Sequence, residues 1–92
     1  MGAVRANPKD MREFAGYLKR FNVMLTEEKR QLRARFVRLG ETWQDQKYQN
    51  FAQEFEQTMR LLDYFEKASE EVVPFLLKDA EILEAYLERR RR

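Results

Sequence analysis

A short break in helical pattern divides this chain into two long segments, and that division limits what the chain can fold into. Gly40, Glu41 and Thr42 form the break, and Trp43 follows directly. Because loops of about 2 to 5 residues join consecutive helices into antiparallel hairpins, the apolar stripes of the two segments are expected to face each other. The pattern predicts an all-α fold, an antiparallel helical hairpin with a tryptophan turn, as one domain over residues 1–92.

The first helix is expected over about residues 8–39. Asn7 can cap the free amides at its start, and Pro8 suits the first helical position. Its apolar stripe follows three-four spacing and consists of Met11, Phe14, Leu18, Phe21, Leu25, Leu32 and Leu39. The stripe weakens toward the turn, where Glu28 and Arg35 fall on it.

The turn is expected at residues 40–42, with Gly40 ending the first helix in the left-handed conformation. Thr42 and Asp45 stand three residues apart, which is typical of a cap followed by a first-turn acid. Trp43 then has two candidate roles. Its ring can cover the last turn of the first helix, or it can anchor a partner, since tryptophan is enriched among residues that dominate binding.

The second helix is expected over about residues 43–90 and has more apolar surface than one neighbour can cover. The candidate residues for its core or for dimer contacts are Phe55, Leu62, Phe65, Val72, Leu76, Leu83 and Tyr86. Two further rows flank them, made of Met59, Val73, Ala80 and Leu87 on one side and Leu61, Ala68, Phe75 and Ile82 on the other. A stripe this wide is typical of a bundle of three or four helices.

Pro74 interrupts the second helix, because its missing N–H removes the bond to the Glu70 carbonyl and favours a kink or a break. Folding about residues 41 and 42 places residue i near residue 83 − i, so the end of the second helix is expected to extend beyond the first by roughly 24 Å. Either this end packs on a second chain or it folds back as a third helix. Val73 is a poor helix cap, which favours a longer, kinked second helix in a dimer that forms a four-helix bundle.

The charges are distributed in blocks that favour pairing of the two helices. Residues 1–40 hold ten Lys and Arg against four Asp and Glu, whereas residues 41–88 hold four against twelve, and four arginines follow at 89–92. A basic helix beside an acidic one favours the antiparallel pair, although each exposed ion pair contributes only about 0 to 1 kcal/mol. Charge therefore selects the neighbour and adds little stability.

The residue types argue against catalysis, because the chain has no histidine and no cysteine. Acidic pairs such as Glu66 with Glu70, and Glu81 with Glu84, lack the histidine that completes a metal site in helical bundles. Ser69 likewise has no histidine to act as a base. We expect no catalytic residue, no cofactor and no metal site.

A basic cluster made of Lys29, Arg30, Arg33, Arg35 and Arg38, together with the arginine tail, could neutralise phosphates. Acidic residues of the second helix offset this cluster, and a run of arginines also suits the negative end of the preceding helix. Nucleic acid is thus disfavoured as a partner, and an adaptor that binds nucleic acid or a larger assembly is the alternative function. No apolar run reaches the roughly 20 residues of a membrane span, and the start lacks the apolar segment of a cleavable signal peptide. The compartment stays open.

The mid-chain sequence Leu39-Gly40-Glu41-Thr42-Trp43-Gln44-Asp45, with Phe51, Phe55 and Leu62 after it, resembles the Trp-x-Gly family of helical hairpins. The resemblance covers residues 8–88. Proteins of that family are substrates and partners of type VII secretion. The resemblance implies a homodimer, or a heterodimer with a related small helical protein, that forms a four-helix bundle, contacts a secretion machine or effector, leaves the cell without a cleavable signal peptide and has no catalytic activity.

Two positions depart from the family pattern. Asp45 stands where the pattern has glycine, which indicates a capped turn rather than a closely packed one. Many members carry a Tyr followed four residues later by Asp or Glu after the second helix, whereas Tyr86 is followed at that spacing by Arg90. The basic tail also suits a relative that is not secreted.

Overall fold

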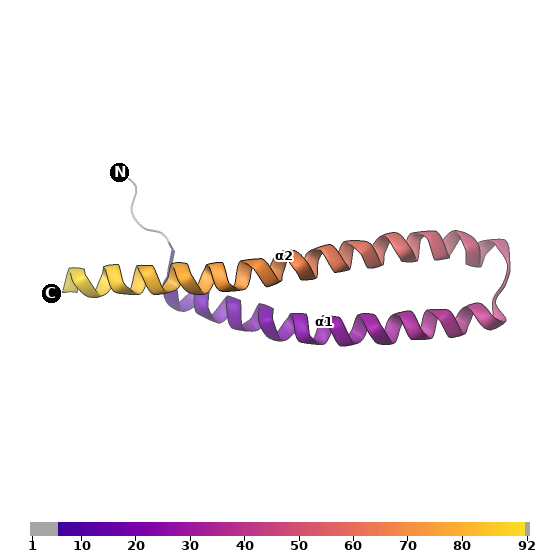
Figure 1. Ribbon diagram of the computed structural model, residues 1–92, viewed down its shortest axis with the longest axis horizontal. Coiled ribbons are helices and arrows are strands. Elements are labelled where there is room, and N and C mark those ends of the chain that lie inside the picture. The colour runs from indigo at the N-terminus through magenta and orange to yellow at the C-terminus, as the bar shows by residue number, and fades with distance from the viewer. Residues whose placement is uncertain (1–5, 92) are drawn as a thin grey trace.

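The computed structural model of the protein describes residues 6–91. Two long helices lie side by side in it (Figure 1). Helix α1 spans Pro8–Thr42 and helix α2 spans Gln46–Arg91. The helices run antiparallel, and the molecule is a flat rod with extents of 70 × 26 × 15 Å. The predicted all-α hairpin with a longer second helix is confirmed.

The start of α1 follows the sequence signal, but its end does not. Oδ1 of Asn7 accepts hydrogen bonds from the backbone N–H groups of Lys9 and Asp10, at 2.8 and 3.2 Å. At the other end Gly40 is helical, and no glycine among residues 6–91 has a positive φ. The prediction that Gly40 ends the helix in the left-handed conformation is therefore wrong. The helix ends because Trp43 is extended, with its N–H bonded to the Leu39 carbonyl at 2.9 Å.

The turn lies at residues 43–45, three residues later than expected, and Asp45 caps α2. Oδ1 of Asp45 accepts the backbone N–H of Tyr48 at 3.0 Å, three residues on, as an N-cap side chain does. The hydroxyl of Thr42 instead donates to the Leu39 carbonyl at 3.4 Å, inside α1. Thr42 is thus not the cap of α2, and Asp45 precedes the first turn of α2.

Helix α2 continues through Pro74 as one helix, so the third-helix alternative is wrong. Pro74 is exposed, and so is Glu70, whose carbonyl loses its usual donor. Water can satisfy that carbonyl at an exposed position, which lets the helix continue. Figure 1 shows α2 changing direction gradually along its length.

The register of the helices differs from the predicted one. Asn22 lies opposite Ser69, and Phe36 opposite Phe55, so residue i lies near residue 91 − i rather than 83 − i. Arg12, near the start of α1, reaches Glu84 near the end of α2. The end of α2 therefore extends beyond α1 by only about eight residues, or about 12 Å.

The two helices meet along one seam with heptad spacing, three then four residues apart. From α1 the seam includes Met11, Ala15, Leu18, Asn22, Leu25, Lys29 and Phe36, and from α2 it includes Phe55, Met59, Leu62, Glu66, Ser69, Val73, Leu76, Ala80 and Leu83. Ala15, Met59 and Ala80 are fully buried, and the two alanines let the helices approach closely. Three of the candidates for the core or for dimer contacts lie outside this seam and are 42 to 47% exposed, and they are Phe65, Val72 and Tyr86.

Candidate docking face

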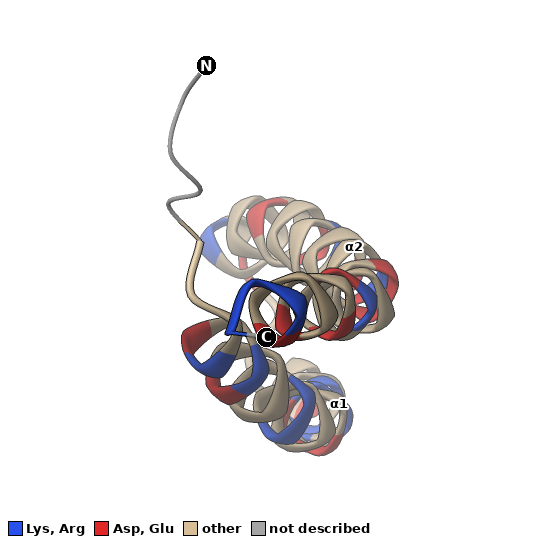
Figure 2. Cartoon of the chain, turned by 90° about the vertical axis from the view of Figure 1, so that its left-hand side faces the viewer, with Lys and Arg blue, Asp and Glu red and all other residues tan. Residues whose placement is uncertain are grey.

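One long face of the hairpin, here called the ion-paired face, is closed by charges that meet across the seam. It is formed by Arg12, Lys29 and Arg33 of α1 and by Glu56, Asp63, Glu66 and Glu84 of α2. Arg12 holds Glu84 through two hydrogen bonds of 2.6 and 2.8 Å. In the end-on view of Figure 2, basic bands of α1 and acidic bands of α2 both reach the right-hand side.

Lys29 is the centre of the ion-paired face. Its ammonium group contacts the carboxylates of Asp63 and Glu66, each at 2.5 Å, and only 11% of its side chain is exposed. Hydrogen bonds to Asp63 and then to Glu66 raise the pKa of Lys29. Lys29 in turn lowers the pKa of Asp63, and together with the Thr26 hydroxyl it lowers the pKa of Glu66. All three groups are therefore charged at neutral pH.

The opposite face, here called the apolar face, has large side chains that no other part of residues 6–91 covers. From α1 it comprises Phe14, Tyr17, Phe21 and Met24, and from α2 it comprises Leu61, Phe65, Val72, Phe75, Ile82 and Tyr86. Each exposes between 41 and 69% of its surface. The rings of Phe21 and Phe65 meet edge to face across the seam with centroids 6.1 Å apart, which places both stripes on the same side of the hairpin.

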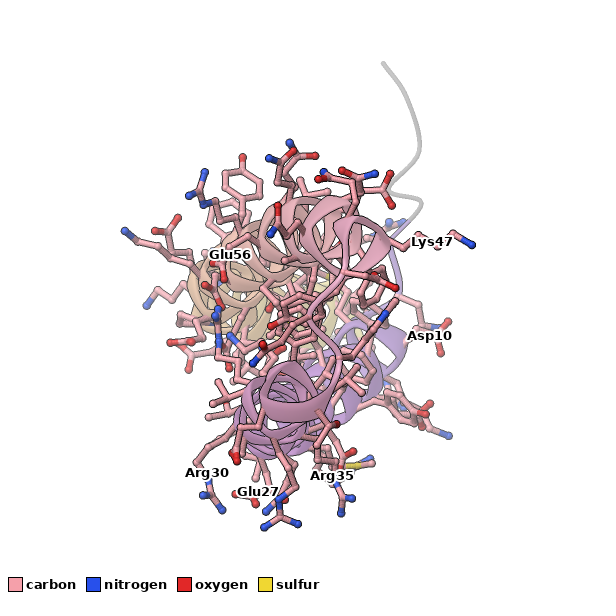
Figure 3. All side chains as sticks on the ribbon, turned by 90° about the vertical axis from the view of Figure 1, so that its right-hand side faces the viewer. Asp10, Glu27, Arg30, Arg35, Lys47 and Glu56 are labelled. Atoms are coloured by element: carbon pink, nitrogen blue, oxygen red, sulfur yellow. The ribbon has the colours of Figure 1, made fainter. Side chains whose placement is uncertain are left out.

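The view from the turn end separates the two faces. Glu56, one heptad before Asp63, points to the left in Figure 3. Lys47 and Asp10 point to the right. Lys47 shares a seven-residue row with Leu61, and Asp10 shares one with Met24, so the apolar stripes lie on the right-hand side of this view.

A polar layer crosses the middle of the seam between the two faces. Nδ2 of Asn22 donates to Oγ of Ser69 at 2.7 Å, and that hydroxyl donates to the Glu66 carbonyl at 2.9 Å. Asn22 is 7% exposed, and its Oδ1 has no hydrogen-bond partner. A buried amide of this kind fixes the register of coiled coils, because any shift leaves it unpaired. The sequence pattern missed this layer, although Asn22 and Ser69 both stand at heptad positions.

The turn carries an aromatic cluster rather than an exposed tryptophan. Phe36 stacks on Phe55 at 4.0 Å and on Tyr48 at 5.3 Å, and Trp43 meets Tyr48 edge-on at 5.4 Å. Trp43 is half-buried. The backbone N–H of Tyr48 and then the Trp43 side chain lower the pKa of Asp45. These contacts account for Trp43 as a residue that closes the turn, and its role in recognition stays a prediction.

Gly40 is needed at the turn for space and not for backbone freedom. A Cβ at Gly40 would lie 2.9 Å from Cζ of Tyr48 and closer still to the hydroxyl of that ring. Such a contact is too short for real side chains, so a larger residue would move the ring off Phe36. Gly40 thus lets Tyr48 lie directly against α1.

The basic cluster of α1 is partly neutralised within the hairpin. Lys29 and Arg33 pair with acids of α2, and Arg30 pairs with Glu27 at 2.7 Å on the outer side of α1. Arg35 and Arg38 are exposed beside a shallow groove at the turn end. The basic residues therefore do not form one continuous surface.

Residues 6–91 include no group of three or more acidic side chains placed to hold a metal ion. Neither helix, within that part of the chain, is long and apolar enough to cross a membrane. No protein-family model, curated protein or solved structure matches the chain. The resemblance to the tryptophan-turn family thus stays a prediction from its motif, and function is argued from the geometry of the two faces.

Proposed function

We propose that the protein is a non-enzymatic interaction module that works as a homodimer, in which the apolar faces of two copies meet to form a four-helix bundle. The observation that carries this proposal is the spacing of the exposed residues on α2. These residues follow one another at intervals of four, seven, three, seven and four, with Ala68 and Asp79 at the skipped positions, and they are Leu61, Phe65, Val72, Phe75, Ile82 and Tyr86. This spacing is a second heptad stripe beside the seam, and heptad stripes pack against helices.

The size of the apolar face suits a stable dimer. Its ten large side chains each expose about half of their surface. With roughly 150 to 250 Å² for a large aromatic side chain and less for an aliphatic one, the face offers about 800 to 1,000 Å². A standard interface buries about 800 Å² per partner. Soluble monomers rarely expose apolar patches of more than about 600 Å², so a partner for this face is expected.

A pair of substitutions at equally exposed residues tests the proposal. Leu61 lies on the apolar face and Val23 on the outer side of α1, and each is 69% exposed. Light scattering and sedimentation of the purified chain should show a dimer. Leu61→Asp should give monomers with retained helix content, because it places a charge in the interface, whereas Val23→Asp should remain dimeric. A wild-type chain that stays monomeric at all concentrations contradicts the proposal.

Two more specific functions of this interaction module are also proposed. Export as a type VII secretion substrate is supported by the tryptophan turn and by the hairpin fold. An adaptor that binds nucleic acid is less well supported, because Lys29 and Arg33 already pair with acids of α2. Nucleic-acid retention that falls steeply between about 50 and 200 mM salt, and disappears when residues 89–92 are deleted, would favour the adaptor.

A further inference from the structure

The apolar stripes of the two helices differ in length but are centred at the same level of the hairpin. The α2 stripe runs from Leu61 to Tyr86, or about 38 Å, and the α1 stripe runs from Phe14 to Met24, or about 15 Å. Their midpoints lie near residues 73 and 19, which are opposite each other because residue i lies near 91 − i. The apolar face is thus long on α2 and short on α1, and it lies closer to the end of the hairpin where α1 begins and α2 ends than to the turn.

Two-fold symmetry permits two ways of placing such faces together. In a parallel dimer, with both turns at one end, α2 of one copy lies on α1 of the other at the same level. Leu61 would then meet a residue near Gln31, and Ile82 a residue near Asp10. The long stripe would have polar residues opposite both of its ends.

In an antiparallel dimer, with the turns at opposite ends, each helix lies on the same helix of the other copy, α1 on α1 and α2 on α2. Reversal about residue 73 brings Leu61 to the level of residue 85 and Phe65 to that of residue 81, which are beside Tyr86 and Ile82. On α1, reversal about residue 19 brings Phe14 to the level of Met24. The long stripe thus pairs with the long stripe and the short one with the short one, and apolar residues meet apolar residues except where Asp79 interrupts the α2 stripe.

The charges at the two ends of the long stripe support the same arrangement. Glu54 stands one heptad before Leu61 and Arg89 one heptad after Ile82, so both lie on one row of α2 and both are exposed. Antiparallel packing places Glu54 of each copy within about one helical turn of residues 89–91 of the other. Parallel packing would place the two arginine runs at the same end, where like charges repel.

We propose that two copies of this chain associate antiparallel through the apolar face, with α2 on α2, α1 on α1, and Glu54 of each copy against the arginine run of the other. This inference rests on the proposed self-association and adds the arrangement and the terminal contact. It gives the C-terminal arginines a structural role. It also leaves the two Trp43 turns free at opposite ends of one rod, so that the dimer presents two identical ends.

Cysteine cross-linking tests the arrangement, because the chain has no cysteine of its own. Val72 lies beside the proposed two-fold axis, so oxidised Val72→Cys protein should form a disulfide-linked dimer. In a parallel dimer, residue 72 would instead face α1 of the other copy and would not cross-link. Lys67→Cys, an exposed position on the outer side of α2, is the matched control and should not cross-link.

Spin labels at Gln44→Cys give an independent measure. The turn is about 29 residues from the axis, so the two labels should lie about 85 Å apart in the antiparallel dimer. Parallel packing would bring them within about 30 Å. A dimer with the short distance and no disulfide at residue 72 overturns the arrangement and leaves the self-association standing. A chain that stays monomeric overturns both.

Charge reversal tests the terminal contact by itself. Glu54→Arg and Arg89→Glu should each weaken the dimer by about five-fold at low salt. The double variant should return to within about two-fold of the starting affinity, because it restores opposite charges. Equal loss in the double variant and in the sum of the two single variants would overturn the pairing of Glu54 with the arginine run.

Discussion

The two long faces of this hairpin come from the same two helices, yet one face is satisfied within the chain and the other is not. On the ion-paired face, Arg12, Lys29 and Arg33 each find a carboxylate on α2. On the apolar face, side chains such as Leu61 and Phe75 expose two thirds of their surface. The ion-paired face therefore selects how α1 meets α2. In the proposed dimer, the apolar face supplies the energy for association with the second copy.

The difference follows from what each kind of interaction contributes. Exposed ion pairs such as Arg12 with Glu84 contribute little free energy but penalise a wrong register, where like charges meet. Apolar surface contributes about 25 cal/mol per Å² when buried, whatever the partner's exact register. A two-helix hairpin has only one seam to bury, so within residues 6–91 the remaining apolar stripe stays uncovered.

The largest effect is expected from a matched pair of methionines that separates folding from association. Met59 is fully buried in the seam, whereas Met24 is 64% exposed on the apolar face. Met59→Ala should lower the free energy of unfolding by about 2 to 5 kcal/mol, because it removes contacts and leaves a cavity. Met24→Ala should leave unfolding of the dilute monomer unchanged and raise the dimer dissociation constant by about ten-fold. Denaturant titration at several protein concentrations measures both.

The comparison would fail if the two methionine variants behaved alike. An equal loss of stability in dilute Met24→Ala protein would mean that the apolar face already packs within the monomer. Leu62, a candidate for the core or for dimer contacts, is half-buried, so its replacement by Ala should cost less than that of Met59.

The next effect concerns the polar layer that keeps the faces in register. Ser69→Ala leaves Nδ2 of the buried Asn22 without its acceptor and should destabilise the hairpin by about 1 to 3 kcal/mol. Asn22→Leu in the same chain should recover most of that loss, since neither polar partner then remains. Thermal unfolding of the single and double variants gives the coupling between the two residues. Additive losses would show that the two side chains do not form a pair.

The two helices and the hairpin follow from the sequence. The sequence does not predict which residues of one helix lie opposite which residues of the other. The three-four spacing and the Asn7 cap predict the helices, and the position of the break predicts the hairpin. The register was wrong mainly because the turn lies at residues 43–45 rather than 40–42. A turn displaced by three residues shifts every facing pair by six, which is most of the observed shift of about eight. Periodicity alone cannot locate the turn that closely.

The choice of seam on α1 failed for a different reason. Phe14 and Phe21 are larger and more apolar than Ala15 and Asn22, so the sequence pattern favoured the phenylalanine row for the seam. The structure buries Ala15 and Asn22 and leaves both phenylalanines exposed, because small side chains let the helices approach. When a helix has apolar residues on two sides, a single sequence does not say which side faces its own chain.

A smaller effect is expected at the turn end, where Gly40 belongs to the same heptad row as Arg12 and Arg33. Gly40→Ala should destabilise the hairpin by about 1 to 2 kcal/mol, although alanine favours helix, because its Cβ would displace the Tyr48 ring from Phe36. In a Tyr48→Ala background the same change should become stabilising by up to about 1 kcal/mol. Destabilisation of equal size in both backgrounds would contradict the close contact as the cause.

The smallest effect is expected from titrating the ion-paired face. The pKa values of Asp63, Glu66 and Glu84 lie below their ordinary values of 3.8, 4.5 and 4.5, because Lys29 and Arg12 favour the charged forms. Their contribution is complete above those ordinary values and is lost as pH falls through the lowered ones. The pKa of Lys29 is raised from 10.5, so its contribution is lost only as pH rises beyond that value. The thermal midpoint should be flat near neutral pH and fall by roughly 5 °C on acidification to about pH 3.

A Lys29→Met, Asp63→Asn, Glu66→Gln variant should lose most of this fall, whereas Glu13→Gln, an exposed change, should keep it. If the triple variant kept the whole fall, loss of these ion pairs would not be the cause of the destabilisation in acid.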